Sequence, residues 1–79
     1  MLCPRPITVK PLENYRLFLC FDNGEKKIFD VTPYLSGDWF GQLFDIAKFN
    51  TVHISNKHVE WCDGQDIAPH ELYENSIDI

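Results

Sequence analysis

Two apolar runs separated by an Asn-Gly turn are the feature that most constrains what this chain can fold into. The runs are residues 15–21 and 26–31, and the turn between them is Asp22-Asn23-Gly24-Glu25. Asn-Gly between two such runs is the strongest short-range signal of a β-hairpin. We therefore expect an antiparallel sheet. The 79-residue length predicts one domain over residues 1–79, with an ordered core at about 7–74.

The loop of this hairpin allows two registers. A two-residue loop places Phe21 opposite Lys26, whereas a three-residue loop closed by a bulge at Gly24 places Phe21 opposite Glu25. We favour the bulged register because it puts the large apolar side chains on one face and a pair of opposite charges on the other. The apolar face then consists of Tyr15, Leu17, Leu19, Phe21, Phe29 and Val31.

The other face of the hairpin keeps Phe18, Cys20 and Ile28, so it is not purely polar in either register. Contiguous apolar side chains on a protein surface mark a place where something else binds. We predict that these three residues form a partner surface. Self-association is also expected, because so small a core leaves little free energy of folding in reserve.

The two ends of the chain predict extended segments. Ile7-Thr8-Val9 lies between Pro6 and Pro11, and because proline donates no ladder hydrogen bond, this run predicts an edge strand. Residues 75–79 are expected to form a mobile tail or a stray edge strand.

Two further segments predict short helices. Residues 38–49 carry apolar side chains at three- and four-residue spacing, and the face that they form would cover the sheet. Residues 69–74 begin with Pro69, which suits the first position of a helix.

A second hairpin is predicted from strands at 51–55 and 58–62 around the turn Asn56-Lys57. Pairing Ser55 with His58 gives the alternation of a half-solvated sheet, and the chain as a whole reads as an α+β fold built on an antiparallel sheet. One face of the hairpin is apolar and consists of Val52, Ile54, Val59 and Trp61. The other face is polar and consists of Thr51, His53, Ser55, His58, Glu60 and Cys62.

The charge and the cysteines limit the partners and the compartment. Twelve Asp and Glu against seven scattered Lys and Arg give a net charge of −5. Nucleic-acid-binding domains usually carry a basic stripe, so we expect no direct nucleic-acid binding, and an acidic surface suits a basic protein partner. No apolar run approaches the roughly 20 residues of a membrane span. Three widely spaced cysteines (Cys3, Cys20, Cys62) and the lack of a signal-peptide pattern predict a cytoplasmic protein.

The polar face of the second hairpin is the best candidate for chemistry. His, Glu and Cys side chains bind zinc, and a Cys beside a His can form a nucleophile–base pair. However, His53, His58, Glu60 and Cys62 lack the tight spacing of structural zinc ligands and any visible oxyanion donor. We therefore expect no catalytic residue, metal or cofactor. The aspartates at turns and caps are interpreted as bonding their own backbone, and they are Asp22, Asp30, Asp45, Asp63 and Asp66.

The landmarks of the chain also resemble a known pattern. They are Phe21-Asp-Asn-Gly24, Phe29-Asp30, Leu43-x-Asp45-x-x-x-Phe49-x-x-Val52 and Val59-x-Trp61-x-x-Gly64-x-Asp66-Ile-Ala-Pro69-x-x-Leu72-Tyr73. Over about residues 7–74 the chain resembles the small bacterial domain-of-unknown-function family 2442, and it departs at Cys62, where the family commonly has proline. The resemblance implies an α+β domain without an assigned activity. Some relatives carry the domain beside a helix-turn-helix domain and others are encoded beside a small toxin-like partner, which implies regulation through protein contacts.

Three functions stay open at this point. The first, which we favour, is a non-catalytic protein-interaction or regulatory module, in one form an antitoxin-like partner of a small basic protein. The second is a ligand-sensing domain that acts with a DNA-binding regulator and needs a pocket among Trp39, Phe40, Phe44 and Trp61. The third is a small metal- or thiol-dependent enzyme that uses the polar face of the second hairpin.

Overall fold

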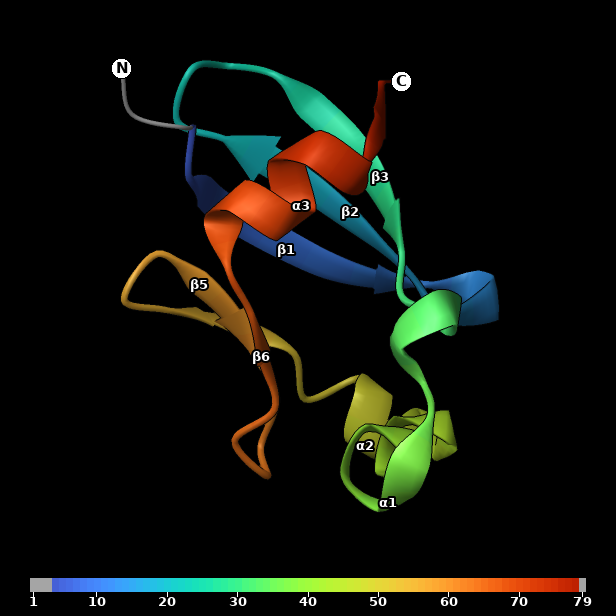
Figure 1. Cartoon of the computed structure of the whole chain (residues 1–79). Coiled ribbons are helices and arrows are strands. Elements are labelled where there is room, and N and C mark those ends of the chain that lie inside the picture. The colour runs from blue at the N-terminus through green and yellow to red at the C-terminus, as the bar shows by residue number, and fades with distance from the viewer. Residues whose placement is uncertain (1–3, 79) are drawn as a thin grey trace.

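The first predicted hairpin forms the centre of an antiparallel sheet of four strands. A computed structural model of the chain describes residues 4–78, so Cys3 and Ile79 lie outside the described residues. In spatial order the strands of this sheet are β1 (Pro6–Leu12), β2 (Arg16–Phe21), β3 (Lys26–Asp30) and β7 (Ile77–Asp78). Figure 1 shows α3 (Pro69–Asn75) crossing one face of the sheet.

The loop between β2 and β3 has the bulged register. The Phe21 N–H donates to the Glu25 carbonyl at 2.8 Å, and the Gly24 N–H donates to the Phe21 carbonyl at 3.0 Å. Gly24 has a φ of +90°, which glycine adopts without the steric cost that a Cβ would bring. Arg16 lies opposite Asp30, as the bulged register requires. The face expected to be apolar is buried, with no exposed surface at Leu17, Leu19, Phe21, Phe29 and Val31.

The N-terminal strand is an edge strand, as predicted, and it is longer than the three residues that the sequence indicated. β1 runs from Pro6 to Leu12 and includes Pro11, with a register shift between Pro6 and Thr8. An edge strand accepts proline because its outward N–H groups have no partner strand to bond. The position at the edge therefore explains why two prolines did not confine the strand to the residues between them.

The second hairpin forms a separate sheet and does not extend the first one. Its strands are β4 (His53–Ser55), β5 (His58–Glu60) and β6 (Asp66–Ile67), in the order β4-β5-β6. The predicted register holds, with Ser55 opposite His58, although both hairpin strands are shorter than expected. β4 lies next to β1, whose two prolines remove N–H donors that a continuous ladder would use. The α+β class is confirmed, with two antiparallel sheets in place of one.

The segment expected as a helix at 38–49 is three short turns that do not cover the sheet. They are α1 (Gly37–Phe40), the 3₁₀ turn η3 (Gly41–Phe44) and α2 (Ile46–Phe49), and they lie together beyond one end of the large sheet (Figure 1). Asp45 separates the last two because its backbone is extended and its carboxylate accepts a hydrogen bond from the Ala47 N–H at 3.0 Å. Further 3₁₀ turns lie at Glu13–Tyr15 (η1) and Thr32–Tyr34 (η2).

The C-terminal helix and the strand after it close the fold. α3 begins with Pro69 in its first turn, as predicted. Leu72 has no exposed surface, and the Tyr73 ring meets the Phe21 ring edge-on at 5.3 Å. In place of a mobile tail, residues 77–78 form the edge strand β7, which was the alternative expectation for this segment.

Trp61 links the two sheets through the core. Its side chain has no exposed surface, and its Nε1–H donates to the Phe49 carbonyl of α2 at 3.0 Å. The core cluster joins residues of β2, β3, β5, β6, α2 and α3. Among the described residues no helix is long and apolar enough to cross a membrane.

Candidate interaction surface

The large sheet brings together the three residues predicted as a partner surface, on the face opposite α3. Phe18 lies directly opposite Ile28, and Cys20 follows two residues along β2 on the same face. The strand registers add side chains from β1, β3 and β7 to this face. We call it the outer face, and it consists of Thr8, Lys10, Leu12, Arg16, Phe18, Cys20, Lys26, Ile28, Asp30 and Ile77.

The centre of the outer face is apolar and only half buried. Phe18, Cys20 and Ile28 are all partly exposed, and Ile77, which pairs with Ile28, is 69% exposed. Within residues 4–78, Figure 1 shows no helix on this side of the sheet. The turns of residues 38–49, expected to cover the sheet, lie beyond one end of it. The result is a row of large apolar side chains in contact with water on the two central strands and one edge strand.

The rim of the outer face is cationic, although the chain is acidic. Lys10, Arg16 and Lys26 are exposed there, and the ammonium groups of Lys10 and Lys26 have no ion pair within the described part of the chain. Arg16 uses one guanidinium N–H on the Glu13 carbonyl at 3.4 Å. Asp30 is the acid of this face, and its carboxylate accepts a hydrogen bond from the Thr32 N–H at 2.9 Å. Most of the negative charge lies in residues 38–78, which hold eight Asp or Glu and two Lys.

Part of the outer face was missed by the reasoning from the sequence. Lys10 and Leu12 lie on it because β1 continues through Pro11, and the alternation of residues 8, 10 and 12 is the signal that could have shown this. Ile77 joins it because β7 pairs with β3, and no local pattern in residues 75–79 indicates that pairing.

The polar residues of the second hairpin do not assemble into a common site. His53 lies opposite Glu60 on the neighbouring strand, whereas the His58 imidazole Nδ1 is 3.8 Å from a carboxylate oxygen of Asp66. Cys62 is exposed, lies after the end of β5, and donates its backbone N–H to the Thr51 hydroxyl at 3.1 Å. Among the described residues no group of three or more His, Cys, Asp or Glu is placed to hold a metal ion.

The four rings proposed as a ligand pocket are dispersed. Trp61 is fully buried, Trp39 is half exposed and contacts Phe40 edge-on at 5.5 Å, and Phe44 contacts Tyr15 edge-on at 5.4 Å. None of these four rings lines the cavity beside Arg5 and His58 or the cavity beside Glu13 and Asn50. Trp61 instead serves the core, as its carbonyl partner in α2 indicates.

The aspartates singled out in the sequence have structural partners. Asp30 and Asp45 each accept a hydrogen bond from the backbone N–H two residues on, which confirms the interpretation for these two. Asp22 accepts instead from the backbone N–H of Arg5, which is distant in the sequence. Asp63 and Asp66 differ, because they lie in ion pairs. Asp63 is 3.2 Å from the Lys48 ammonium, and Asp66 is beside His58.

Two tyrosines tie α3 to the large sheet and the segment after it. The Tyr34 hydroxyl donates to a Glu71 carboxylate oxygen at 3.1 Å, and burial, this hydrogen bond and the negative charge of Glu71 raise the pKa of Tyr34. The Tyr73 hydroxyl donates to a Glu25 carboxylate oxygen at 3.1 Å. That hydrogen bond is the largest cause of the raised pKa of Tyr73, and the Lys27 ammonium, 4.6 Å from the ring centre, opposes it.

Comparison with known proteins gives one match. The model of a family described as protein of unknown function (DUF2442) matches residues 6–78, which is nearly the whole chain. No curated protein and no solved structure matches significantly.

Proposed function

Since the chain belongs to the family of proteins of unknown function DUF2442, we propose that it is a non-catalytic protein-interaction module that binds its partner through the outer face. The observation that carries the proposal is the uncovered apolar centre, in which Phe18 lies opposite Ile28 on the two central strands. Exposed apolar side chains rimmed by polar ones are typical of protein-binding surfaces.

The charges around that centre favour a particular partner chemistry. Lys10, Arg16 and Lys26 surround the apolar residues, so the complementary surface has an apolar centre and carboxylates at its edge. A basic partner, which the net charge of the chain favours, would have to contact residues 38–78 instead. The two possibilities place the partner on opposite parts of the molecule, and we propose the first.

The described chemistry of the chain supports a binding role over a catalytic one. The His53 ring lies 3.0 Å from the Thr51 carbonyl, and the His58 ring lies beside Asp66, so the two histidines have separate partners. Cys20 and Cys62 are both free thiols, which agrees with a reducing, cytoplasmic compartment as part of the proposal.

The proposal is tested by asking whether one captured protein depends on the outer face. The wild-type chain, Ile28→Glu and the control Glu60→Gln would be immobilised and exposed to a lysate of the native organism. Ile28→Glu puts a charge at the apolar centre, whereas Glu60 lies on the other sheet. We expect a protein that the wild type and Glu60→Gln retain and that Ile28→Glu loses. Circular dichroism would establish that both variants are folded.

Hydrogen exchange with the purified partner would then locate the contact. Protection of β2 and β3, together with weaker binding at high salt and in Lys26→Glu, supports the proposal. Protection confined to residues 38–67, or equal retention by Ile28→Glu, would overturn it and favour a basic partner on the acidic segments. A dimer that Ile28→Glu abolishes, measured by light scattering, would assign the outer face to a second copy of the chain.

A further inference from the structure

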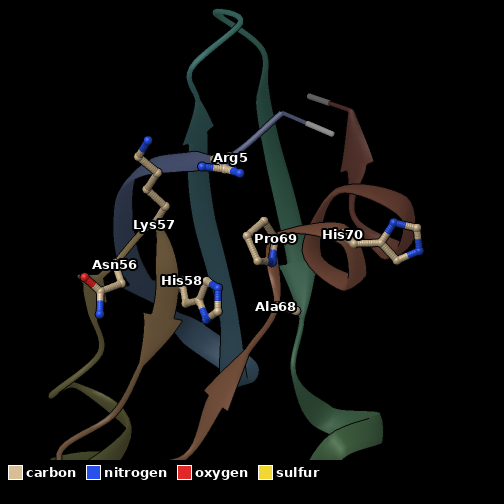
Figure 2. Close-up of a pocket in the computed structure, with 7 residues that line it drawn as sticks. All are labelled: Arg5, Asn56, Lys57, His58, Ala68, Pro69 and His70. Carbon is tan, nitrogen blue, oxygen red and sulfur yellow. The ribbon is translucent and has the colours of Figure 1, made fainter. Parts of the chain in front are cut away.

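A cavity of about 420 Å³ lies between the second hairpin and the start of α3, away from the outer face. Three segments far apart in the sequence line it, and Figure 2 shows how they meet. Arg5 precedes β1, residues 56–58 form the turn between β4 and β5, and residues 68–70 lead into α3. The volume falls within the range of small-molecule sites, which starts at about 300 Å³.

Two permanent cations line this cavity without an acid to neutralise them. The Arg5 guanidinium and the Lys57 ammonium make no hydrogen bond or ion pair within residues 4–78. Other cations of the chain do find carboxylates, as Lys48 does with Asp63 at 3.2 Å. Arg5 is a partly buried residue, and its guanidinium keeps all of its side-chain donors for a bound group. An anion in the cavity would supply the missing partner.

The other side chains of the cavity differ in what they add. In Figure 2 the His58 ring points from β5 toward Ala68 and Pro69, whereas the His70 ring points away from the cavity. His70 pairs with Glu74 on its own helix. Asp66 lies 3.8 Å from His58 Nδ1, so this ring, unlike Arg5 and Lys57, has a carboxylate neighbour within the chain. The cavity therefore has a cationic side, made by Arg5 and Lys57, and an apolar side.

The turn that presents Lys57 is fixed by its backbone. Asn56 and Lys57 have φ values of 50° and 67°, the left-handed conformation that a two-residue hairpin loop needs. Asn and Gly are the usual residues at such positions, so a lysine there is unfavourable for the turn itself. Strained backbone positions often coincide with functional ones, and here the strained residue is exposed and is one of those that line the cavity.

We propose that this cavity binds a small phosphate-bearing anion. Arg5 provides planar paired donors for phosphate oxygens, Lys57 provides a second charge, and the rest of the molecule lies against Ala68 and Pro69. The cavity is much larger than a phosphate ion, so an ester fills it better than free phosphate does. This site is separate from the outer face and does not depend on the proposed function.

The test is a titration of the ¹⁵N-labelled chain followed by amide shifts at constant ionic strength. The probes are inorganic phosphate, adenosine monophosphate and, as the uncharged control, adenosine. We expect saturating shifts at Arg5, at residues 56–58 and at Ala68 with both phosphates, and tighter binding of the monophosphate. Equal affinities for the two would assign the site to free phosphate. Response to adenosine alone, or shifts that do not saturate, would overturn the proposal.

Matched variants separate a built site from general attraction of anions. Lys57→Asn removes the charge and keeps a residue that tolerates the turn, and Arg5→Gln removes the other cation. Each should weaken binding about tenfold, as the loss of one charge-assisted contact does. Arg16→Gln, which removes a cation at the far end of the large sheet, should leave the affinity unchanged. Equal weakening in Arg16→Gln and Lys57→Asn would show an adventitious ion only.

Discussion

The two sheets of this molecule differ in the polarity of the side chains on their solvent-facing sides. The small sheet exposes polar side chains such as His53 and Asp66, and it buries Val59 and Ile67. The large sheet buries its inner face as completely, but its outer face presents Phe18 and other apolar side chains to water. The small sheet therefore has the polar side chains of a surface that stays in water. The large sheet has the apolar side chains of a face that another element or protein covers.

The difference separates stability from interaction. All of the fully buried side chains of the large sheet lie on the inner face, against α3 and the second hairpin. Phe18, Cys20 and Ile28 on the outer face are half buried, so each adds less to folding than a fully buried residue of the inner face does. A partner that covered this face would bury the apolar surface that folding leaves exposed.

The strongest test compares phenylalanines on the two faces of the same hairpin. Phe29 has no exposed surface, so Phe29→Ala should lower the free energy of unfolding by about 3–5 kcal/mol. Phe18 is half buried, and Phe18→Ala should cost less, about 1–2 kcal/mol. Urea denaturation measures both, with Phe29→Leu as the milder variant if Phe29→Ala does not fold. Equal losses would mean that the outer face belongs to the core.

The second test concerns a buried amide in the turn of the small sheet. Gln65 has no exposed surface, its Nε2 donates to the Trp39 carbonyl at 2.8 Å, and its Oε1 has no partner among the described residues. Gln65→Glu would place a carboxylate against that carbonyl and should cost about 3 kcal/mol at neutral pH.

Gln65→Met is the matched control for that variant. It removes the hydrogen bond to Trp39 together with the unpaired oxygen, so the change should stay within about 1 kcal/mol. Thermal unfolding at pH 7 compares the two. A Glu variant as stable as the Met variant would show that the site is open to water.

The sequence predicted the turns, caps and hairpin registers of the two sheets. It did not predict the pairings between segments that are far apart in the chain. The bulge at Gly24, the pairing of Ser55 with His58 and the cap at Asp45 follow from neighbouring residues, and all three are present. The composition of the outer face depends on strands that pair across the chain, so Leu12 and Ile77 were missed.

The helical segment shows a similar limit. The spacing of apolar residues in 38–49 indicated a helical face that covers the sheet, but the segment forms three short turns that lie beyond one end of the sheet (Figure 1). The cavity near Arg5 and Lys57 could not have been predicted, because only the folded chain brings these two residues together.

The third test uses the tyrosine that ties the segment after β3 to α3. The pKa of Tyr34 is raised above its ordinary value of 10.0, so the folded state keeps the phenol proton to higher pH than the unfolded state does. The stabilisation that the protonated Tyr34 phenol provides is therefore fully present below about pH 10, and it is lost as the pH rises through the raised pKa. Tyr34→Phe should lose about 1 kcal/mol at pH 7, where the hydrogen bond to Glu71 is missing. Between pH 10 and 11 its stability should fall less steeply than that of the wild type. Parallel curves would contradict this assignment.

The smallest change in the free energy of unfolding is expected on the polar side of the small sheet, at a pair of like charges. Glu60 lies directly opposite Asp66, and cross-strand like charges are destabilising. Glu60→Gln should therefore raise the free energy of unfolding by about 0.3 kcal/mol at low salt, and the gain should vanish in 1 M salt because exposed charges are screened. Ile28→Thr on the outer face of the large sheet provides the contrast, since its effect has no electrostatic part and should persist at high salt. A gain from Glu60→Gln that persists in 1 M salt would mean that packing, and not charge, decides this surface. The two sheets would then differ less than their compositions indicate.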